Sequence, residues 1–210
     1  MEEGSIPRSA RRRAGGRVGA FGSIIPGMRE IRRLGMVARW KPVHLGHAAV
    51  LEALLERADE VVIGIGSSNR YDVRNPFTPE ESADMIRRVL GDRGPYELIQ
   101  VPDLGNGPRW REMVAGLLGP LDLFVTANTY VRDLLQEVYP VIHPVRLIPP
   151  ERRIALDGTA VRKAMARGEG WRDLVPPAVA ALIDERGLAA RFRREFGLAT
   201  LALDTPSPLD

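Results

Sequence analysis

Apolar residues recur along this chain with two periods, one typical of strands and one typical of helices. The run Val-Val-Ile-Gly-Ile at residues 61–65 is continuous and mostly β-branched, which indicates a strand covered on both faces. Elsewhere apolar positions lie three or four residues apart, as in the stripe Val50, Leu51, Leu54 and Leu55, which indicates an amphipathic helix. The combined pattern predicts strands within 34–38, 61–65, 98–101, 121–126 and 141–148, and helices over 48–57, 78–90, 110–118, 131–138, 159–167 and 177–186.

The alternation of strands and helices predicts the fold class. It indicates an α/β fold, a doubly wound, Rossmann-like parallel sheet with helices on both faces. Crossover connections in such a sheet are right-handed, and its ligands bind beyond the carboxyl ends of the strands. A chain of 210 residues can bury one sizeable core, so we expect a single domain over residues 28–202.

Both ends of the chain depart from this pattern. Residues 1–27 contain three consecutive arginines, several glycines and little periodicity. We expect them to be disordered, or to be an over-extended start with Met28 or Met36 as the initiator, with a basic nucleic-acid-binding arm as the functional alternative. Residues 203–210 are expected to form a flexible tail.

Composition excludes several classes of protein. The absence of cysteine excludes disulfides and thiolate metal sites. No apolar run approaches the roughly 20 residues of a membrane span, which predicts a cytoplasmic protein without a membrane partner. The net charge is +3, from 30 Lys and Arg against 27 Asp and Glu, which is too small to indicate nucleic acid as a partner.

The candidate chemistry is concentrated in one short phrase after the first predicted strand. There His44-Leu45-Gly46-His47 opens an amphipathic helix, and a helix N-terminus attracts anions through its unpaired N–H groups and its dipole. His44 and His47 can donate hydrogen bonds to phosphate oxygens, and Gly46 lets a phosphate approach the backbone. Arg39, at the strand end, can bind phosphate with two parallel bonds. The phrase therefore predicts a site for a phosphate chain.

Two other interpretations of the histidine pair stay open. Either histidine could be purely structural. His44 and His47, three residues apart, could also share a zinc ion, but no cysteine, third clustered histidine or His-Glu-x-x-His helix supports a metal site.

A second phrase, at residues 157–162, has the same character. It again combines a strand exit, a Gly-Thr turn and a helix start. Thr159 can cap the helix or donate to phosphate. Arg162 lies in the first helical turn, where a positive charge opposes the dipole unless an anion occupies the helix end. Alone, the phrase also describes an ordinary capped helix.

Together the two phrases resemble the nucleotidyltransferase superfamily, and within it the archaeal-type nicotinamide-nucleotide adenylyltransferases. Residues 38–47 resemble the family's Gly-Arg-Phe-Gln-Pro-x-His-x-Gly-His, and the resemblance extends over about residues 34–185. The further blocks that resemble the family, in the same order, are Ile63-Gly64-Ile65-Gly66-Ser67, Asn75-Pro76-Phe77-Thr78, Pro102-Asp103-Leu104 with Trp110, Thr126-Ala127-Asn128, residues 157–162, and Trp171-Arg172-Asp173-Leu174-Val175-Pro176.

The resemblance implies a nucleotidyltransferase fold and a reaction in which nicotinamide mononucleotide (NMN) attacks the α-phosphorus of ATP, giving NAD and pyrophosphate. Mg²⁺ would accompany ATP, bound mainly by phosphates and water rather than by a protein metal site, and a homo-oligomer is plausible. The implied catalytic residues are His44, His47, Arg39 and Arg162. The implied ATP site is Arg39, Lys41, His44, Gly46, His47, Asn128, Gly158, Thr159 and Arg162. The implied NMN site is Asp103, Leu104 and Trp110, with Trp110 as a core aromatic in the alternative.

The chain departs from the family pattern at several positions. Lys41 replaces glutamine and either strengthens triphosphate binding or faces solvent. Ser82 stands where the family often has arginine, which removes one phosphate contact. Asp157 replaces serine and could repel phosphate, accompany a cation or cap the helix. Residues 67–74 differ most, so the acceptor is less certain than adenylyl transfer. A different phosphorylated acceptor, or a non-catalytic nucleotide-binding protein on the same fold, are the alternatives.

Overall fold

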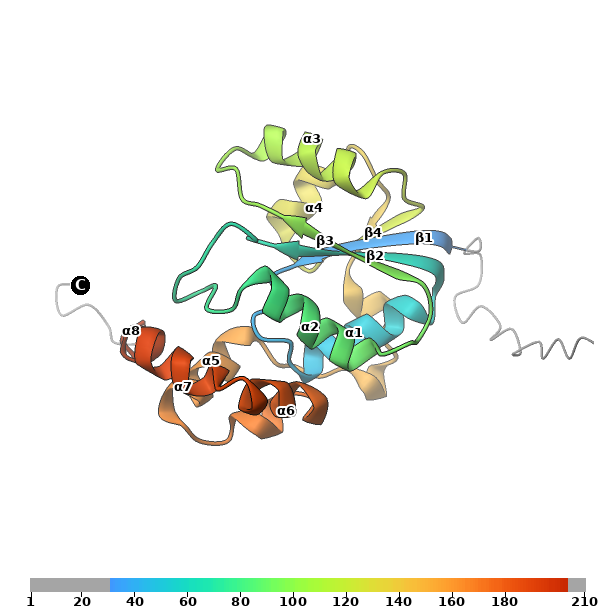
Figure 1. The fold of residues 1–210 in the computed structure, drawn as a ribbon. Coiled ribbons are helices and arrows are strands. Elements are labelled where there is room, and N and C mark those ends of the chain that lie inside the picture. The colour runs from blue at the N-terminus through green and yellow to red at the C-terminus, as the bar shows by residue number, and fades with distance from the viewer. Residues whose placement is uncertain (1–30, 204–210) are drawn as a thin grey trace, which may run out of the picture.

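The computed structural model describes residues 31–203 and contains one parallel sheet (Figure 1). Its five strands lie in the order β3-β2-β1-β4-β5, and every neighbouring pair is parallel. The sheet therefore grows outward in both directions from β1, and the strand order reverses between β1 and β4. The strands are β1 (Ile31–Ala38), β2 (Ala58–Gly66), β3 (Tyr96–Val101), β4 (Leu123–Val125) and β5 (Val141–Ile142).

Helices cover both faces of the sheet. Figure 1 shows helices both above and below the sheet. The upper layer holds α3 (Gly107–Leu118) and α4 (Thr129–Leu135). The lower layer holds α1 (Leu45–Leu55), α2 (Pro79–Leu90), α5 (Gly158–Arg167), α6 (Pro177–Glu185), α7 (Leu188–Phe192) and α8 (Leu198–Ala202), with a π-helical turn over Arg193–Gly197 between the last two. None of the helices within residues 31–203 is long and apolar enough to cross a membrane.

Two apolar clusters, one on each face, hold the layers together. Successive residues of β2 alternate between them: Val61 and Ile63 are buried in the lower cluster, and Val62 is buried in the upper one. Side chains of a strand point alternately to opposite faces, so a strand covered on both faces must be apolar throughout. This explains the continuous apolar run that predicted β2.

Local signals fix where helices begin. At α2 the Thr78 hydroxyl accepts from the Glu81 backbone N–H at 3.2 Å, and the Glu81 carboxylate accepts from the Thr78 N–H at 3.0 Å. With Pro79 at the first helical position, these bonds satisfy backbone donors that the helix itself leaves unpaired. The capping box confirms the helix start that the sequence predicts.

The predicted doubly wound fold is confirmed, with two differences in the elements. Only Val141–Ile142 of the predicted strand 141–148 pairs in the sheet, because Pro144, Pro149 and Pro150 lie in short turns that follow. The helical stretch from 188 to 202 was not predicted. Met36 lies within β1, so a chain beginning there would lack most of that strand; Met28 lies outside the described residues.

Candidate active site

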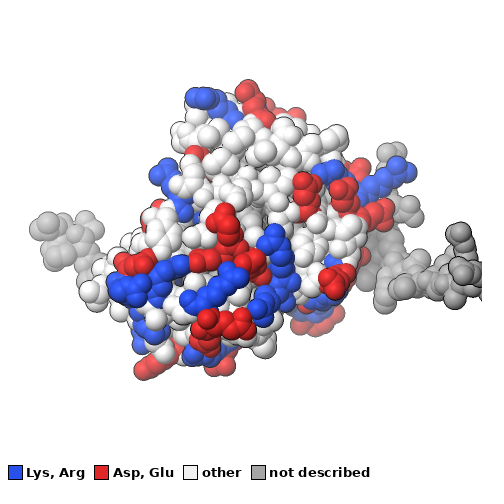
Figure 2. All heavy atoms as spheres, viewed as in Figure 1, with Lys and Arg blue, Asp and Glu red and all other residues white. Residues whose placement is uncertain are grey.

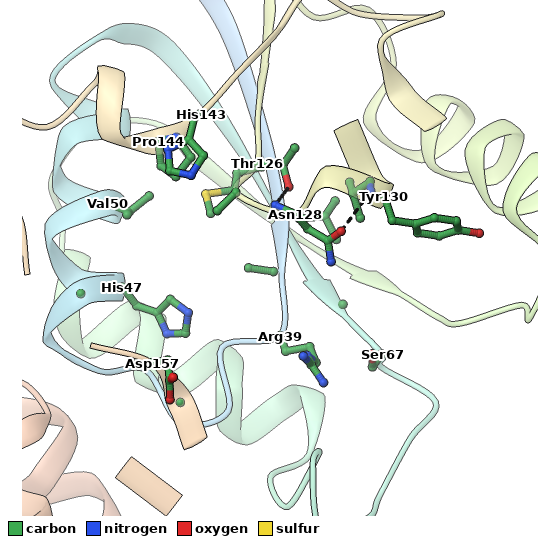
Figure 3. Close-up of a pocket in the computed structure, with 18 of the residues that line it drawn as sticks. Arg39, His47, Val50, Ser67, Thr126, Asn128, Tyr130, His143, Pro144 and Asp157 are labelled. Atoms are coloured by element: carbon green, nitrogen blue, oxygen red, sulfur yellow. Dashed lines mark hydrogen bonds between the residues drawn. The ribbon is translucent and has the colours of Figure 1, made fainter. Parts of the chain in front are cut away.

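A large cavity lies where the strand order reverses (Figure 3). Its volume is about 1030 Å³, and its floor is formed by the carboxyl ends of β1, β2, β4 and β5. Residues Arg39, Ser67, Asn128 and His143, one from the end of each of these strands, line it. This is the place where a doubly wound sheet binds its ligands, and it is large enough for two nucleotides.

The two histidines of the first phrase stand at the start of α1. Their rings stack with centroids 3.7 Å apart and planes 21° apart. His44 is the N-cap of α1, and its Nδ1 accepts from the His47 backbone N–H at 3.2 Å. Both residues line the cavity, and Figure 3 shows His47 pointing into it. The cap holds the rings at the helix end where phosphate is expected.

Burial keeps both imidazoles neutral. It lowers the pKa of His44 to about 4, with the positive charge of Arg162 adding to the effect and Asp157 opposing it. Burial also lowers the pKa of His47 well below its usual value, and His44 contributes to that shift. Because Nδ1 of His44 accepts a bond, its single proton must be on Nε2. The Nδ1 atom of His47 is buried and has no hydrogen-bond partner within residues 31–203.

Arginines bring positive charge to the same corner. Arg39 extends from the end of β1 along the cavity, and no bond to its guanidinium is found within residues 31–203 (Figure 3). Arg162 lies behind the cavity wall, where it donates to the Lys41 carbonyl at 3.1 Å and to the Thr159 hydroxyl at 3.2 Å. Burial and then the charges of Arg39 and Arg74 lower the pKa of Arg162. Asp157 and Asp72 oppose this effect, so three arginines and two carboxylates leave a positive balance in this corner, which favours an anion.

The second phrase forms the start of α5. Asp157 is its N-cap, and one carboxylate oxygen accepts from the backbone N–H groups of Thr159 and Ala160 at 2.7 and 2.8 Å. These bonds, the one from Ala160 first, lower the pKa of Asp157. A Cβ on Gly158 would lie 2.9 Å from Nη1 of Arg162, so glycine lets that side chain pass. Of the interpretations of Asp157, the structure shows the helix cap.

The predicted acceptor residues lie on the β2–β3 side of the cavity. Asp103, Leu104 and Trp110 all line it. Asp103 exchanges two bonds with Asn69, donating its N–H to Oδ1 at 2.8 Å and accepting from Nδ2 at 2.9 Å. Trp110 also packs against the upper apolar cluster, so it is both a core aromatic and a cavity wall.

Comparisons with known proteins identify the family. Residues 37–164 match the model of the cytidylyltransferase-like family. The chain is 39% identical over 158 residues to the nicotinamide-nucleotide adenylyltransferase of Methanocorpusculum labreanum, covering 74% of this chain and 92% of that protein. The chain belongs to the nicotinamide-nucleotide adenylyltransferase family. The family member from Thermococcus onnurineus is 38% identical over 154 residues, covering 71% of this chain and 80% of that protein.

A solved structure confirms the fold of this nicotinamide-nucleotide adenylyltransferase family member. The bifunctional NMN adenylyltransferase/ADP-ribose pyrophosphatase of Francisella tularensis, in complex with AMP and a manganese ion, superposes with a TM-score of 0.65 at 17% identity. The match covers 84% of this chain and 57% of that longer one. At this identity the likeness concerns the fold alone.

The structure excludes one of the two predicted roles of Lys41 in this adenylyltransferase family member, that of facing solvent. The residue is 2% exposed, so it does not face solvent. Its side chain is not part of the cavity lining, and its ammonium donates to the Ser67 carbonyl at 2.8 Å. Thr159 and Arg162 likewise stand behind the lining, whereas Gly46, Asn128 and Gly158 line it.

Several lining residues were missed by the sequence reasoning. Tyr130 and Leu134 of α4 face the acceptor side, and Arg70 stands 3.8 Å from the Asp103 carboxylate. His143 lies directly after β5 and also lines the cavity. Arg153 lines it too, and its side chain donates to the Ile148 carbonyl at 3.0 Å, which stabilises the turns after β5. His143 was missed because it lies inside the range 141–148 in which a strand was predicted, whereas β5 ends at Ile142.

The ligands that this site can offer to a metal ion are few. Within residues 31–203 no group of three or more His, Asp or Glu side chains could enclose a metal ion. The carboxylates that line the cavity are those of Asp103 and Asp157, and the second already accepts two backbone bonds. The donor set therefore suits a cation that arrives with phosphate oxygens and water as its main ligands.

Proposed function

We propose that this protein transfers the adenylyl group of MgATP to NMN, giving NAD and pyrophosphate. The observation that carries the proposal is the placement of two stacked, neutral histidines at the N-terminus of α1 and of Arg39 at the end of β1, all lining a cavity with room for both nucleotides. Mg²⁺ enters as part of the ATP substrate. We expect the reaction to take place in the cytoplasm without nucleic acid, and self-association stays a prediction.

The chemistry requires positioning and charge stabilisation rather than a covalent intermediate. A phosphate oxygen of NMN forms a bond to the α-phosphorus of ATP while the bond from that phosphorus to the bridging oxygen of the β-phosphate breaks. Negative charge develops on the leaving pyrophosphate. His44 Nε2–H and the ring of His47 are placed to bind the phosphates, and Arg39 is placed to neutralise the charge.

Arg162 contributes to this site from behind the cavity wall. Its guanidinium holds the Lys41 carbonyl and the Thr159 hydroxyl, which shapes the turn after β1 and the start of α5. Its charge lies close enough to Arg39 and Asp157 to influence the titration of the site. The backbone around Gly158 and the side chain of Asn128 complete the ATP side.

The acceptor side lies between β3, α3 and α4. Trp110 offers an aromatic wall for the pyridine ring, and Asp103 and Leu104 border it. Tyr130 stands on the other side, with its ring 62% exposed and the cavity beside it. An aromatic wall with a few polar groups is typical of sites that bind planar ligands.

A release assay for pyrophosphate tests the proposal. The full chain is supplied with MgATP and, in turn, NMN, nicotinic acid mononucleotide and a phosphorylated sugar. We expect turnover with NMN, and we expect His47→Ala to lower kcat by about 10²-fold, the scale for losing one transition-state donor. Turnover only with another acceptor would change the substrate, and no turnover with any acceptor would favour a nucleotide-binding role. Near-normal kcat in a folded His47→Ala protein would remove His47 from the catalytic groups.

A further inference from the structure

Lys41 is a buried cation that the proposed chemistry does not use. It lies in the turn between β1 and α1, and only 2% of it is exposed. Its Nζ donates to the Ser67 carbonyl at 2.8 Å, and Ser67 is the first residue after β2. Burying a charged amine is costly unless it is paired, so the burial of Lys41 needs a structural explanation.

The carbonyl that Lys41 holds belongs to an unusual point of the backbone. Ser67 has φ of 51°, in the left-handed region that residues with a Cβ disfavour. Such a conformation persists only when the surroundings hold it. The same carbonyl also accepts from the Arg70 N–H at 3.1 Å. The bond from Lys41 and this backbone bond together fix the peptide that leaves Ser67, and therefore the direction in which the chain leaves β2.

That direction sets the course of residues 67–77, here called the acceptor loop. Beyond Ser67 the loop bonds to the end of β3, through Ser68 N–H to the Val101 carbonyl at 3.2 Å and through the paired Asn69 and Asp103. Ser67 and Arg70 of the loop line the acceptor side of the cavity beside Asp103. A shift at Ser67 would therefore move the wall that the acceptor meets.

Lys41 also connects this loop to the phosphate side. Its carbonyl accepts from Arg162 of α5 at 3.1 Å, while the preceding Trp40 donates its Nε1–H to the Gly64 carbonyl at 2.9 Å. Hydrogen bonds therefore join the turn after β1 to Gly64 of β2, to Ser67 directly after β2, and to α5. The charged groups that act on the Lys41 amine are Asp103, Asp72 and Arg39.

We propose that Lys41 is a positioning residue, which holds the acceptor loop through the Ser67 carbonyl in the geometry that binds the acceptor nucleotide. The kinetic part of this inference rests on the proposed function, because it needs an acceptor whose KM can be measured. A direct phosphate ligand is the competing role, and the committed bond of Nζ and its position outside the cavity lining argue against it.

Three variants test the inference. Lys41→Met fills the space of the side chain and removes the donor. Lys41→Gln keeps a shorter side chain with an N–H donor. Arg93→Met is the matched control, because Arg93 also donates to a backbone carbonyl, that of Leu90 at 3.2 Å, but at the end of α2 away from the cavity lining. Steady-state kinetics give separate KM values for MgATP and NMN, and thermal melting shows that each variant folds.

A second measurement does not depend on catalysis. The acceptor loop contains Arg70 and Arg74, both exposed, and trypsin cleaves after arginine. Limited proteolysis followed by mass spectrometry therefore reports how well the loop is held, whatever the substrate is. The fraction cut at these two arginines is compared with cutting elsewhere in the same sample.

For Lys41→Met we expect the KM for NMN to rise about tenfold or more, the KM for MgATP to stay within about twofold, and cleavage in the acceptor loop to accelerate about fivefold or more. Lys41→Gln should restore part of both effects, and Arg93→Met should show neither. A rise in the KM for MgATP alone, or a higher KM for NMN without faster cleavage, would overturn positioning in favour of direct ligand contact. Unchanged KM values and cleavage in a folded variant would overturn it as well. If Lys41→Met does not fold, Lys41→Gln decides by the same criteria, and if no acceptor supports turnover, the cleavage rate alone decides.

Discussion

At the scale of single residues, neutrality of the histidines is the feature with the widest consequences. Protonated histidines would bind phosphate more strongly, but the burial that positions these rings also lowers their pKa. The proposed phosphate site therefore relies on neutral histidine donors and leaves the fixed positive charge to arginine. Arginine stays charged at every physiological pH, so the charge of the site does not depend on the histidines.

The same burial predicts how stability depends on pH. Burial lowers the pKa of His44 in the folded state from its usual value of 6.5 to about 4. Between these values the unfolded chain binds more protons than the folded one, so the free energy of unfolding falls as the pH drops through this window. At about 1.4 kcal/mol per unit of pKa, His44 alone accounts for a loss of about 2 kcal/mol between pH 7 and pH 5.

Urea denaturation at the two pH values checks this expectation. His44→Asn is the comparison, because asparagine is also a good N-cap and does not titrate in this range. The variant should lose less stability than the wild type on going from pH 7 to pH 5. An equal loss in both proteins would show that other groups cause the dependence.

At the scale of elements, the N-cap of α5 raises the question whether Asp157 only caps the helix or also contacts the cation bound to ATP. If it only caps, Asp157→Ser keeps an acceptor for the Thr159 and Ala160 N–H groups and removes a negative charge near the phosphates. We then expect stability within about 1 kcal/mol of the wild type, and a KM for ATP that is equal or lower. Turnover of Asp157→Ser is then measured at increasing Mg²⁺ concentrations. If the variant needs a sharply higher Mg²⁺ concentration than the wild type, Asp157 holds the ATP-bound cation.

The helical stretch from 188 to 202 contacts the acceptor loop through hydrogen bonds and ring packing. Arg191 of α7 donates to Glu81 of α2, with one bond of 2.7 Å, and to the Pro76 carbonyl at 3.2 Å. The side chains of Arg191 and Glu81 are only 23% and 12% exposed. Tyr71 of the loop bonds to Glu195 and packs edge-on against Phe196, with ring centroids 5.2 Å apart. The ion pair of Arg191 with Glu81 should contribute more to the stability of the fold than an exposed ion pair does, because solvent screens it less.

Double-mutant cycles measure that difference. We expect a coupling free energy of about 2 kcal/mol between Arg191→Met and Glu81→Gln, less than the 3–5 kcal/mol cost of breaking a fully buried pair. The matched control is Arg88 with Glu185, which joins α2 to α6 but is 45% and 53% exposed, and whose coupling should stay below about 1 kcal/mol. Equal coupling free energies in the two cycles would mean that the pair of Arg191 with Glu81 stabilises the fold no more than an ordinary surface ion pair.

At the scale of the whole molecule, the sequence predicted what depends on neighbours in the chain. The strands, the capping box at Thr78 and the histidine phrase are visible in local periodicity and spacing. The stretch from 188 to 202 also carried a signal, with Leu188, Phe192 and Phe196 four residues apart, but Gly197 and the π-helical turn interrupt it.

Contacts between distant residues were beyond local patterns. The bond from Lys41 to Ser67 joins residues 26 apart, and the bond from Arg191 to Glu81 joins residues 110 apart. No spacing rule in a single sequence specifies such partners. The burial of Lys41 in particular is a property of the assembled turn, strand and helix rather than of its own position.

The site also connects the two halves of the fold, which leads to a prediction for the whole chain. Residues of both helical layers line the cavity, His47 from α1 below the sheet and Tyr130 from α4 above it. A ligand that binds only the folded state stabilises it by about 2.7 kcal/mol at a hundredfold excess over its Kd. For a domain of this size that corresponds to a rise in Tm of about 5–10 °C. AMP lacks the β- and γ-phosphates that His44, His47 and Arg39 are placed to meet, so at equal concentration it should raise the Tm less than MgATP. Differential scanning fluorimetry with MgATP, AMP and inorganic pyrophosphate checks this order, and an equal rise with AMP and MgATP would show that the histidine and arginine corner does not bind the triphosphate.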